Sequence, residues 1–180
     1  MNARLKWIIR VLAGIGAGMM LLTGAGYLMP ETHSASRTLV LQTPARTVWQ
    51  RVSDLGGTPS WQPGVTSIRQ DAPLNGNPVW IQDAEWGELP LEVVESRAPS
   101  RLVTRIAPEA IGLADLGFGG TWTWEVGASG LGTTVTITED GVVSSPVYRV
   151  FMTLAGTDAN LQATLEGLAA SYGEEVVWAQ

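Results

Sequence analysis

Residues 121–139 read TWTWEVGASGLGTTVTITE, and this stretch decides the fold class. Before and after a glycine-rich turn, apolar or aromatic residues alternate with polar ones, which is the period-two pattern of a β-strand with one buried face. A turn this short joins antiparallel neighbours, so the stretch predicts a β-hairpin. The side chains expected to share its buried face are Trp122 and Trp124 on the first strand, and Val135, Ile137 and Glu139 on the second.

Short apolar runs of the same kind fill the chain upstream of this hairpin. They are separated by turn residues such as Asn75–Pro78 and Ala98–Ser100, which favour hairpins over crossover helices. Only Pro108–Gly120 is long, and it is predicted to be a loop. The sequence therefore predicts a six-strand antiparallel meander, with strands at Val65–Gln70, Val79–Trp86, Leu89–Ser96, Arg101–Ala107, Thr121–Val126 and Thr133–Glu139.

Helices are predicted on both sides of the meander. Thr43 and Pro44 form a helix-start signature after a first strand at Ala35–Gln42, and a short helical turn around Trp61 follows. At the other end, Pro146–Gly173 is predicted to be one long amphipathic helix whose apolar stripe covers a face of the sheet. The element order is strand, helix, short helix, six strands and long helix, which indicates an α+β fold.

The start of the chain differs in character from the rest. Between Arg10 and Pro30 there is no charged side chain, and a helix over Val11–Met29 would span about 28 Å, close to the hydrocarbon thickness of a bilayer. We therefore expect residues 1–30 to form a short cytoplasmic stub and one transmembrane helix, followed by one domain over residues 31–180. The small residues Thr23–Ala25 leave a cleaved signal sequence as the alternative.

Charge sets the expected orientation and narrows the partners. The three basic residues that precede the apolar run favour a cytoplasmic N-terminus and an extracytoplasmic domain, held at the cell membrane by one span. The other 8 basic residues are outnumbered by 17 acidic ones, so the domain carries a charge of about −9 and nucleic-acid partners are disfavoured.

The sequence also limits the chemistry of any site. Cysteine is absent, which excludes disulfides and cysteine metal sites. The one histidine, His33, is assigned to a polar spacer at Glu31–Ser34, so neither a histidine triad, nor a metal site, nor a cofactor is expected in the domain.

Several residues and their order resemble one family. The resembling pieces are PARTVW at residues 44–49, Trp61 with Pro63, ESRAP at residues 95–99 and GGTWTWE at residues 119–125. Over about Ser34–Tyr172 the chain resembles the START-like SRPBCC superfamily, particularly its polyketide cyclase/dehydrase-like branch. The resemblance implies a helix-grip fold (β-α-α-β6-α), in which a curled antiparallel sheet surrounds a long C-terminal helix and an apolar cavity lies between them. That superfamily includes lipid carriers, hormone receptors and cyclases, so the fold does not identify the ligand.

Ligand-binding candidates follow from the cavity that the resemblance implies. Glu139 is a weak catalytic candidate, because a carboxylate at a cavity rim can act as acid or base, although Asp140–Gly141 is also a turn signal and suits a solvated strand end. Four acids near the Trp86–Glu88 turn are interpreted as facing water rather than as binding a metal: Glu85, Glu88, Glu92 and Glu95. The candidates for contact with a ligand are Trp122, Trp124, Val135, Ile137, Phe151 and Leu154.

Three functions remain open. The leading one is a membrane-tethered module that binds a hydrophobic small molecule or lipid-like ligand without catalysis. The second is an enzyme resembling polyketide cyclases and dehydratases that uses a cavity carboxylate. The third is a structural partner domain in a membrane complex, which would need only a filled core. A buried cavity carboxylate separates the first two, and the existence of a cavity separates both from the third. Neither the ligand nor the oligomeric state follows from the sequence.

Overall fold

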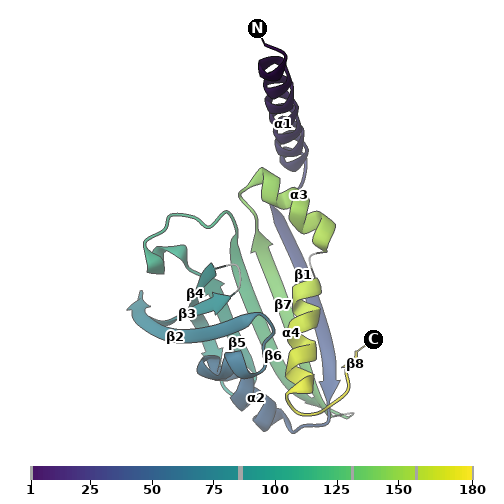
Figure 1. The fold of residues 1–180 in the computed structure, drawn as a ribbon. Coiled ribbons are helices and arrows are strands. Elements are labelled where there is room, and N and C mark those ends of the chain that lie inside the picture. The colour runs from purple at the N-terminus through teal and green to yellow at the C-terminus, as the bar shows by residue number, and fades with distance from the viewer. Residues whose placement is uncertain (1, 85–86, 131, 157, 180) are drawn as a thin grey trace.

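The computed structural model describes residues 2–84, 87–130, 132–156 and 158–179. Within these residues an eight-stranded antiparallel sheet carries helices on one face, and a long helix projects from one end (Figure 1). The elements are α1 (Ala3–Tyr27), β1 (Thr32–Leu41), α2 (Ala45–Ser53), η1 (Leu55–Ser60, a 3-10 helix), β2 (Val65–Leu74), β3 (Asn77–Ala84), β4 (Gly87–Arg97), β5 (Arg101–Ile106), η2 (Pro108–Ile111, a 3-10 helix), β6 (Gly119–Ser129), β7 (Gly132–Val142), α3 (Pro146–Ala155), α4 (Ala159–Ala170) and β8 (Val177–Trp178).

The sheet order is β2-β3-β4-β5-β6-β7-β1-β8, so the predicted six-strand meander is confirmed. The β2–β3 turn shows why the sequence forms hairpins here: Asn75 and Gly76 both have positive φ, +53° and +85°, as a two-residue hairpin turn of matching twist requires. After the meander, β1 pairs with β7 and the two-residue strand β8 pairs with β1. Strand β8 was not predicted, because two residues carry no periodic pattern.

The core lies between the inner face of the sheet and the helices α2 and α4. On α4 three leucines at helical spacing are fully buried, Leu161, Leu165 and Leu168, and α4 contacts β1 and β7. Trp61 packs edge-on against Trp124, with ring centroids 6.0 Å apart and an interplanar angle of 81°. This sheet wrapped over C-terminal helices is the predicted helix-grip architecture, and that prediction is confirmed.

The predicted single helix over Pro146–Gly173 is wrong, because the chain forms two helices there. The break lies at Gly156, whose φ of +87° is open to glycine and strained for other residues. Before the break, α3 turns to pack against the end of α1, and after it α4 packs on the sheet. The apolar periodicity continues through the break, which is why the sequence pattern did not show it.

The first strand begins earlier than predicted. Thr32 already pairs with Val142 of β7, so the predicted spacer at Glu31–Ser34 is wrong.

The predicted cap of α2 is wrong as well. Thr43 does not cap this helix, and its backbone N–H instead donates to the Glu174 carboxylate at 2.8 Å. Burial alone would raise the pKa of Glu174, but the hydrogen bonds from Thr43 and from the Gln42 backbone lower it overall.

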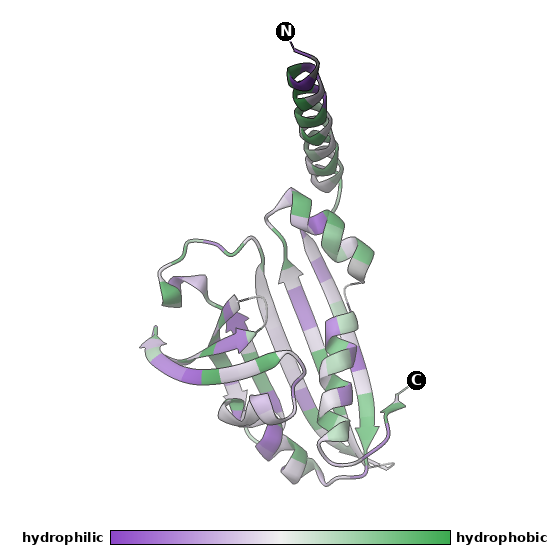
Figure 2. Cartoon of the chain, in the orientation of Figure 1, coloured by the Kyte–Doolittle hydropathy of each residue, from purple (hydrophilic) through white to green (hydrophobic). Residues whose placement is uncertain are grey.

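Helix α1 is apolar along most of its length (Figure 2). Residues Arg4–Tyr27 form the one helix among the described residues that is long and apolar enough to cross a membrane, and the same properties suit a signal sequence. The basic residues Lys6 and Arg10 lie within the helix rather than before it. Long basic side chains can reach the membrane surface from such positions.

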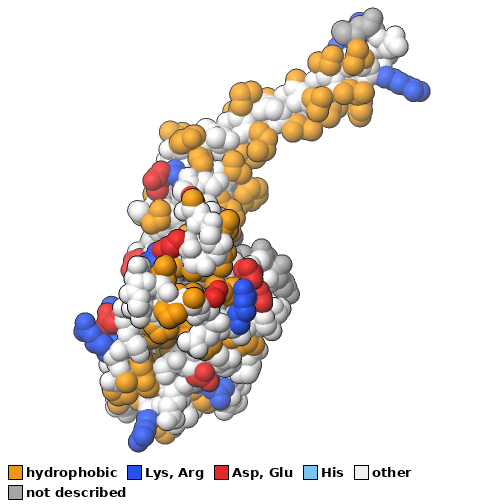
Figure 3. Space-filling view, turned by 90° about the vertical axis from the view of Figure 1, so that its left-hand side faces the viewer, with side chains coloured by type: hydrophobic (Ala, Val, Ile, Leu, Met, Phe, Trp, Pro, Cys, Tyr) orange, Lys and Arg blue, Asp and Glu red, His pale blue; other side chains and the backbone are white. Residues whose placement is uncertain are grey.

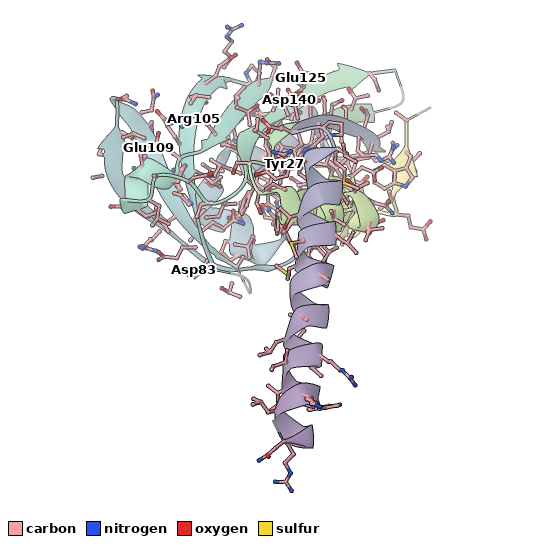
Figure 4. The ribbon with its side chains drawn as sticks, turned by 90° about the horizontal axis from the view of Figure 1, so that it is seen from above. Tyr27, Asp83, Arg105, Glu109, Glu125 and Asp140 are labelled. Atoms are coloured by element: carbon pink, nitrogen blue, oxygen red, sulfur yellow. The ribbon has the colours of Figure 1, made fainter. Side chains whose placement is uncertain are left out.

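The outer face of the sheet carries ion pairs. Glu92 is buried and accepts hydrogen bonds from Arg105 Nε at 2.9 Å and Asn77 Nδ2 at 2.8 Å. The Arg105 guanidinium also pairs with Glu109, and this hydrogen bond lowers the pKa of Glu109 (Figure 4). Glu88 and Glu95 pair with arginines as well, whereas Glu85 and Trp86, the predicted end of a strand and part of the predicted acidic cluster, lie outside the described residues.

Candidate functional site

A cavity of about 310 Å³ lies between the inner face of the sheet and α3. It sits at the end of the domain next to α1, because its walls include the first residues of β1 and β6 and the last residues of β7. This volume falls at the lower end of the range for small-molecule sites. The described residues that line it are His33, Gln62, Pro63, Gly64, Gln82, Ala84, Leu89, Ile106, Phe118, Gly119, Trp122, Glu139, Val142, Val143, Tyr148, Met152 and Asn160.

The break at Gly156 leaves room for this cavity. Helix α4 covers one half of the inner face and presses on the connector after η1, where a Cβ on Gly167 would lie 2.4 Å from the Trp61 carbonyl oxygen. The other half of the face is not covered by a continuation of α4, because α3 bends away toward α1. The cavity is the space between the bent helix and the uncovered strands.

His33 and Glu139 meet inside the cavity. His33 Nε2 lies 3.1 Å from Glu139 Oε1, and both side chains are largely buried. The imidazole ring rests on Gly141, its cross-strand partner, where a Cβ would come within 2.1 Å of His33 Cε1. Strand β7 continues through Asp140 and Gly141 to Val142, so the interpretation of Glu139 as a solvated strand end is wrong. The glycine therefore makes space for a hydrogen-bonded histidine and carboxylate.

The assignment of His33 to a solvated spacer is wrong as well. The missed signal was the alternation that continues upstream from Leu39 through Ala35 to His33, all on one face of β1. Polar residues at Ser34 and Ser36 are compatible with the opposite, outer face of such a strand. The domain therefore contains a histidine that can take part in a polar site.

The aromatic and aliphatic candidates separate into two groups. Trp122, half-buried and paired with Glu139, lines the cavity. Trp124 is only 6% exposed and belongs to the packed core, as do Val135 and Ile137. Trp124 and Ile137 border a second void of only about 20 Å³, which is close to the size of one water molecule. One strand face therefore supplies both cavity wall and core.

The two candidates on α3 lie on the outside of that helix. Phe151 and Leu154 are 57% and 80% exposed, and neither is among the residues that line the cavity. Tyr148 and Met152 of the same helix line it instead. The sequence indicated an apolar helix correctly, but which side faces the sheet depends on the bend at Gly156.

The loop that precedes β6 forms part of the cavity wall. Phe118 stacks on Tyr148 with ring centroids 5.7 Å apart, and both rings line the cavity. The same loop is fastened by Asp115, whose carboxylate accepts hydrogen bonds from the Ser144 hydroxyl at 2.6 Å and from the Gly117 N–H at 2.8 Å. These hydrogen bonds lower the pKa of Asp115.

The polar groups of the cavity can form hydrogen bonds, and one of them is an acid. Besides His33 and Glu139 they include the amides of Gln62, Gln82 and Asn160, and no lysine or arginine is found among the described residues that line it. No cluster of three or more potential metal ligands occurs in the described part of the chain. Such a site suits an apolar molecule with neutral hydrogen-bonding groups.

Comparisons agree with this architecture. A family model described as "Polyketide cyclase / dehydrase and lipid transport" matches residues 32–173. No curated relative matches the sequence. Among solved structures, the Zhui aromatase/cyclase from Streptomyces sp. R1128 is similar with a TM-score of 0.63 and 16% identity, over 78% of this chain and 94% of that one.

Two further solved structures are similar at the same level. A START superfamily protein from Mycobacterium smegmatis has a TM-score of 0.56 and 20% identity, over 78% of this chain and 99% of that one. The di-domain ARO/CYC StfQ from the steffimycin biosynthetic pathway has a TM-score of 0.59 and 13% identity, over 77% of this chain. The match spans only 50% of StfQ. At these identities the likeness shows the fold.

Proposed function

Because the chain belongs to the polyketide cyclase/dehydrase and lipid transport family, we propose that it is a binding module for a neutral, hydrophobic small molecule that carries a hydroxyl or carbonyl group. The observation that supports this most is the cavity itself. Its wall is largely apolar, and a hydrogen-bonded histidine and carboxylate stand within it. A purely structural partner domain would have no use for such a space.

The charge of the lining supports a neutral ligand. Glu139 is the one acid among the described lining residues, and no cation balances a second negative charge there. Fatty acids and phosphate-bearing lipids would place their anion beside this carboxylate, and juxtaposed like charges are strongly unfavourable. A hydroxyl group, in contrast, can both donate to Glu139 and accept from an amide.

The test compares two probes of similar shape. Equilibrium dialysis of the full chain in nanodiscs, corrected with empty nanodiscs, would measure the affinity for 2-naphthol and for the anion 2-naphthoate at pH 7. We expect 2-naphthol to bind at least about tenfold more tightly, or 1.4 kcal/mol. Glu139→Gln should reduce this preference by removing the charge. Tighter binding of 2-naphthoate, or no binding of either probe, would overturn the proposal.

A second candidate function is an enzyme of the cyclase/dehydratase kind, which the contact between His33 and Glu139 favours. A carboxylate hydrogen-bonded to an imidazole can orient it as a proton acceptor. The pair would remove a proton from carbon next to a carbonyl group, and the enolate formed would regain a proton from the pair or from solvent. The similar aromatase/cyclase structure makes this reaction class worth testing.

A proton-exchange assay separates catalysis from binding. The full chain would be incubated with 2-tetralone in deuterated water, and NMR would follow deuterium incorporation next to the carbonyl. Under the catalytic function, Glu139→Gln and His33→Gln each lose about 100-fold or more in exchange rate. Under simple binding, the chain does not accelerate exchange.

We also propose that α1 tethers the domain to the membrane, with the N-terminus in the cytoplasm. The contact of its last turn with the domain supports an anchor rather than a cleaved segment: Gly26 is buried against Pro146, and its carbonyl accepts from Arg149 at 3.3 Å. A reporter that is active only outside the cytoplasm, fused to the C-terminus, should be active. A mature chain that begins near Gly26 would identify a signal sequence instead.

A further inference from the structure

Helix α3 has two apolar faces. Tyr148 and Met152 face the cavity, whereas Phe151 and Leu154 stand on the outside, with Leu154 80% exposed. The helix contains one charged residue, Arg149, and that residue is buried. Exposed large apolar side chains gathered on one surface of a folded domain indicate a surface that is covered in use.

Exposed apolar side chains also lie at the end of α1, which contacts α3. Tyr27 and Leu28, at the end of α1, are 70% and 89% exposed. The space-filling view shows apolar side chains along α1 and on the adjoining end of the domain (Figure 3), and Tyr27 lies where the helix meets the domain (Figure 4). We call Tyr27, Leu28, Phe151 and Leu154 the apolar patch. Its residues lie on helix α3 and at the end of the candidate span, and these two elements contact each other.

Contacts of the buried Arg149 side chain fix α3 relative to α1. The Arg149 guanidinium pairs with Glu31 at 2.6 Å and donates to the carbonyls of Gly26 at 3.3 Å and Val143 at 2.7 Å. A Cβ on Gly26 would lie 1.8 Å from the Pro146 carbonyl oxygen, so the two helices approach backbone to backbone. If α1 crosses a bilayer, these contacts hold α3 close to the bilayer surface.

From these contacts we propose that the outer face of α3, with Tyr27 and Leu28, rests in the surface of a lipid bilayer, so that one wall of the cavity borders the lipid. The inference rests on the proposed tether. Its consequence is that a hydrophobic ligand can exchange with the membrane across or beside α3 without crossing water. The occupant is a neutral or zwitterionic bilayer, because the domain is acidic and the patch offers no exposed cation for an anionic headgroup.

The absence of cysteine in the native chain makes the test direct. Single cysteines would be placed in the full chain by Leu154→Cys, Phe151→Cys, Ile15→Cys within α1, and Val177→Cys on β8. Val177 is the matched control, since it is an exposed apolar residue, 57% accessible, on the strand beside Leu39 and Val40, far from α1 (Figure 1). Each would carry a nitroxide label in phosphatidylcholine vesicles, and electron paramagnetic resonance would compare collisions with oxygen and with a water-soluble nickel chelate.

We expect the labels at 151 and 154 to collide with nickel several-fold less often than the label at 177, and to favour oxygen as a bilayer location requires. Nickel accessibility at 151 and 154 equal to that at 177, with 15 shielded, would leave the tether standing and overturn this inference. Nickel accessibility at all four positions would overturn the tether and this inference together. Shielding of 151 and 154 from both oxygen and nickel, or dipolar broadening between labels, would show a protein contact and also overturn it.

Discussion

Two halves of one sheet face contrast with each other. In the half that lies nearer β8, which we call the filled half, strands β6, β7 and β1 present Trp124, Ile137 and Leu39. These side chains are almost fully buried beneath α2 and α4. In the half that lies nearer α1, which we call the open half, the same face of the same strands presents Trp122, Glu139 and His33, which line the cavity. The strands run unbroken through both halves, so the sheet itself does not make the difference.

The difference comes from the helix layer. Helix α4 brings three fully buried leucines to the first half, whereas the bend at Gly156 carries α3 away from the second. Protein interiors are densely packed, so a strand face that loses its helix either collapses or holds a space kept open by polar groups and aromatic walls. We infer that the filled half provides the stability and the open half provides the binding.

The largest expected effect separates the halves by stability. Leu165→Ala removes a fully buried side chain from α4 and should lower the free energy of unfolding by about 2–5 kcal/mol. Met152→Ala, on the cavity wall of α3, should lower it by about 1 kcal/mol or less, because no filled space is lost. Urea unfolding of the full chain in micelles, followed by tryptophan emission, would measure both. An equal loss of unfolding free energy in the two variants would contradict the difference between the filled and the open half.

The next effect concerns the polar pair in the open half. In Gly141→Ala the new Cβ overlaps the His33 ring, so the imidazole must leave Glu139. The displaced ring then has to take up space in the cavity, so the affinity for 2-naphthol should fall by about tenfold to a hundredfold. Gly127→Ala is the control, because its Cβ would meet only Thr134 Oγ1 at 3.4 Å. Unchanged affinity in Gly141→Ala would show that the contact between His33 and Glu139 takes no part in binding.

The two tryptophans of β6 offer a smaller and symmetrical test. They lie two residues apart on one face, one in each half. Trp122→Phe should reduce the affinity for 2-naphthol by up to about tenfold, or about 1.4 kcal/mol, with little change in stability. Trp124→Phe should do the reverse, lowering stability by about 1 kcal/mol because it loses core contacts with Trp61. Dialysis and urea unfolding of both variants would show whether the pattern holds.

The filled half was the more predictable of the two. Its strands alternate regularly and its leucines recur at helical spacing, so the sheet, the hairpins and the helix-grip order followed from periodicity, turn residues and resemblance. In the open half, the same strand alternation placed Trp122 correctly on the inner face. These features depend on local patterns that a sequence displays directly.

The open half depends on features that periodicity does not display. His33 stands beyond the apolar part of β1, where serines and Arg37 obscure the alternation. Whether Phe151 or Met152 faces the cavity depends on a backbone bend at one glycine, and glycine is compatible with many conformations. The pairing of His33 with Glu139 joins residues 106 positions apart, so only the strand register brings them together.

The smallest expected effect is a pH dependence confined to the open half. The pKa of Asp115 is lowered in the folded chain by hydrogen bonds from the Ser144 hydroxyl and the Gly117 N–H, which fasten the loop that carries Phe118 over the cavity. A group with a lowered pKa stabilises the folded form above its unfolded pKa, and this contribution is lost as the pH falls through the folded value. For an aspartate that window lies below about pH 4.

Acidification should therefore loosen the loop and speed the release of 2-naphthol, which stays neutral in acid. Asp115→Asn, which keeps the shape but loses the charge, should release the probe faster already at pH 7, and its rate should change less on acidification than that of the native chain. Stopped-flow emission would follow the release rate. Glu109→Gln is the matched control, because the pKa of Glu109 is also lowered but its partner is Arg105 on the outer face. If both variants change the release rate equally, the effect is one of overall charge, and the loop does not govern access to the cavity.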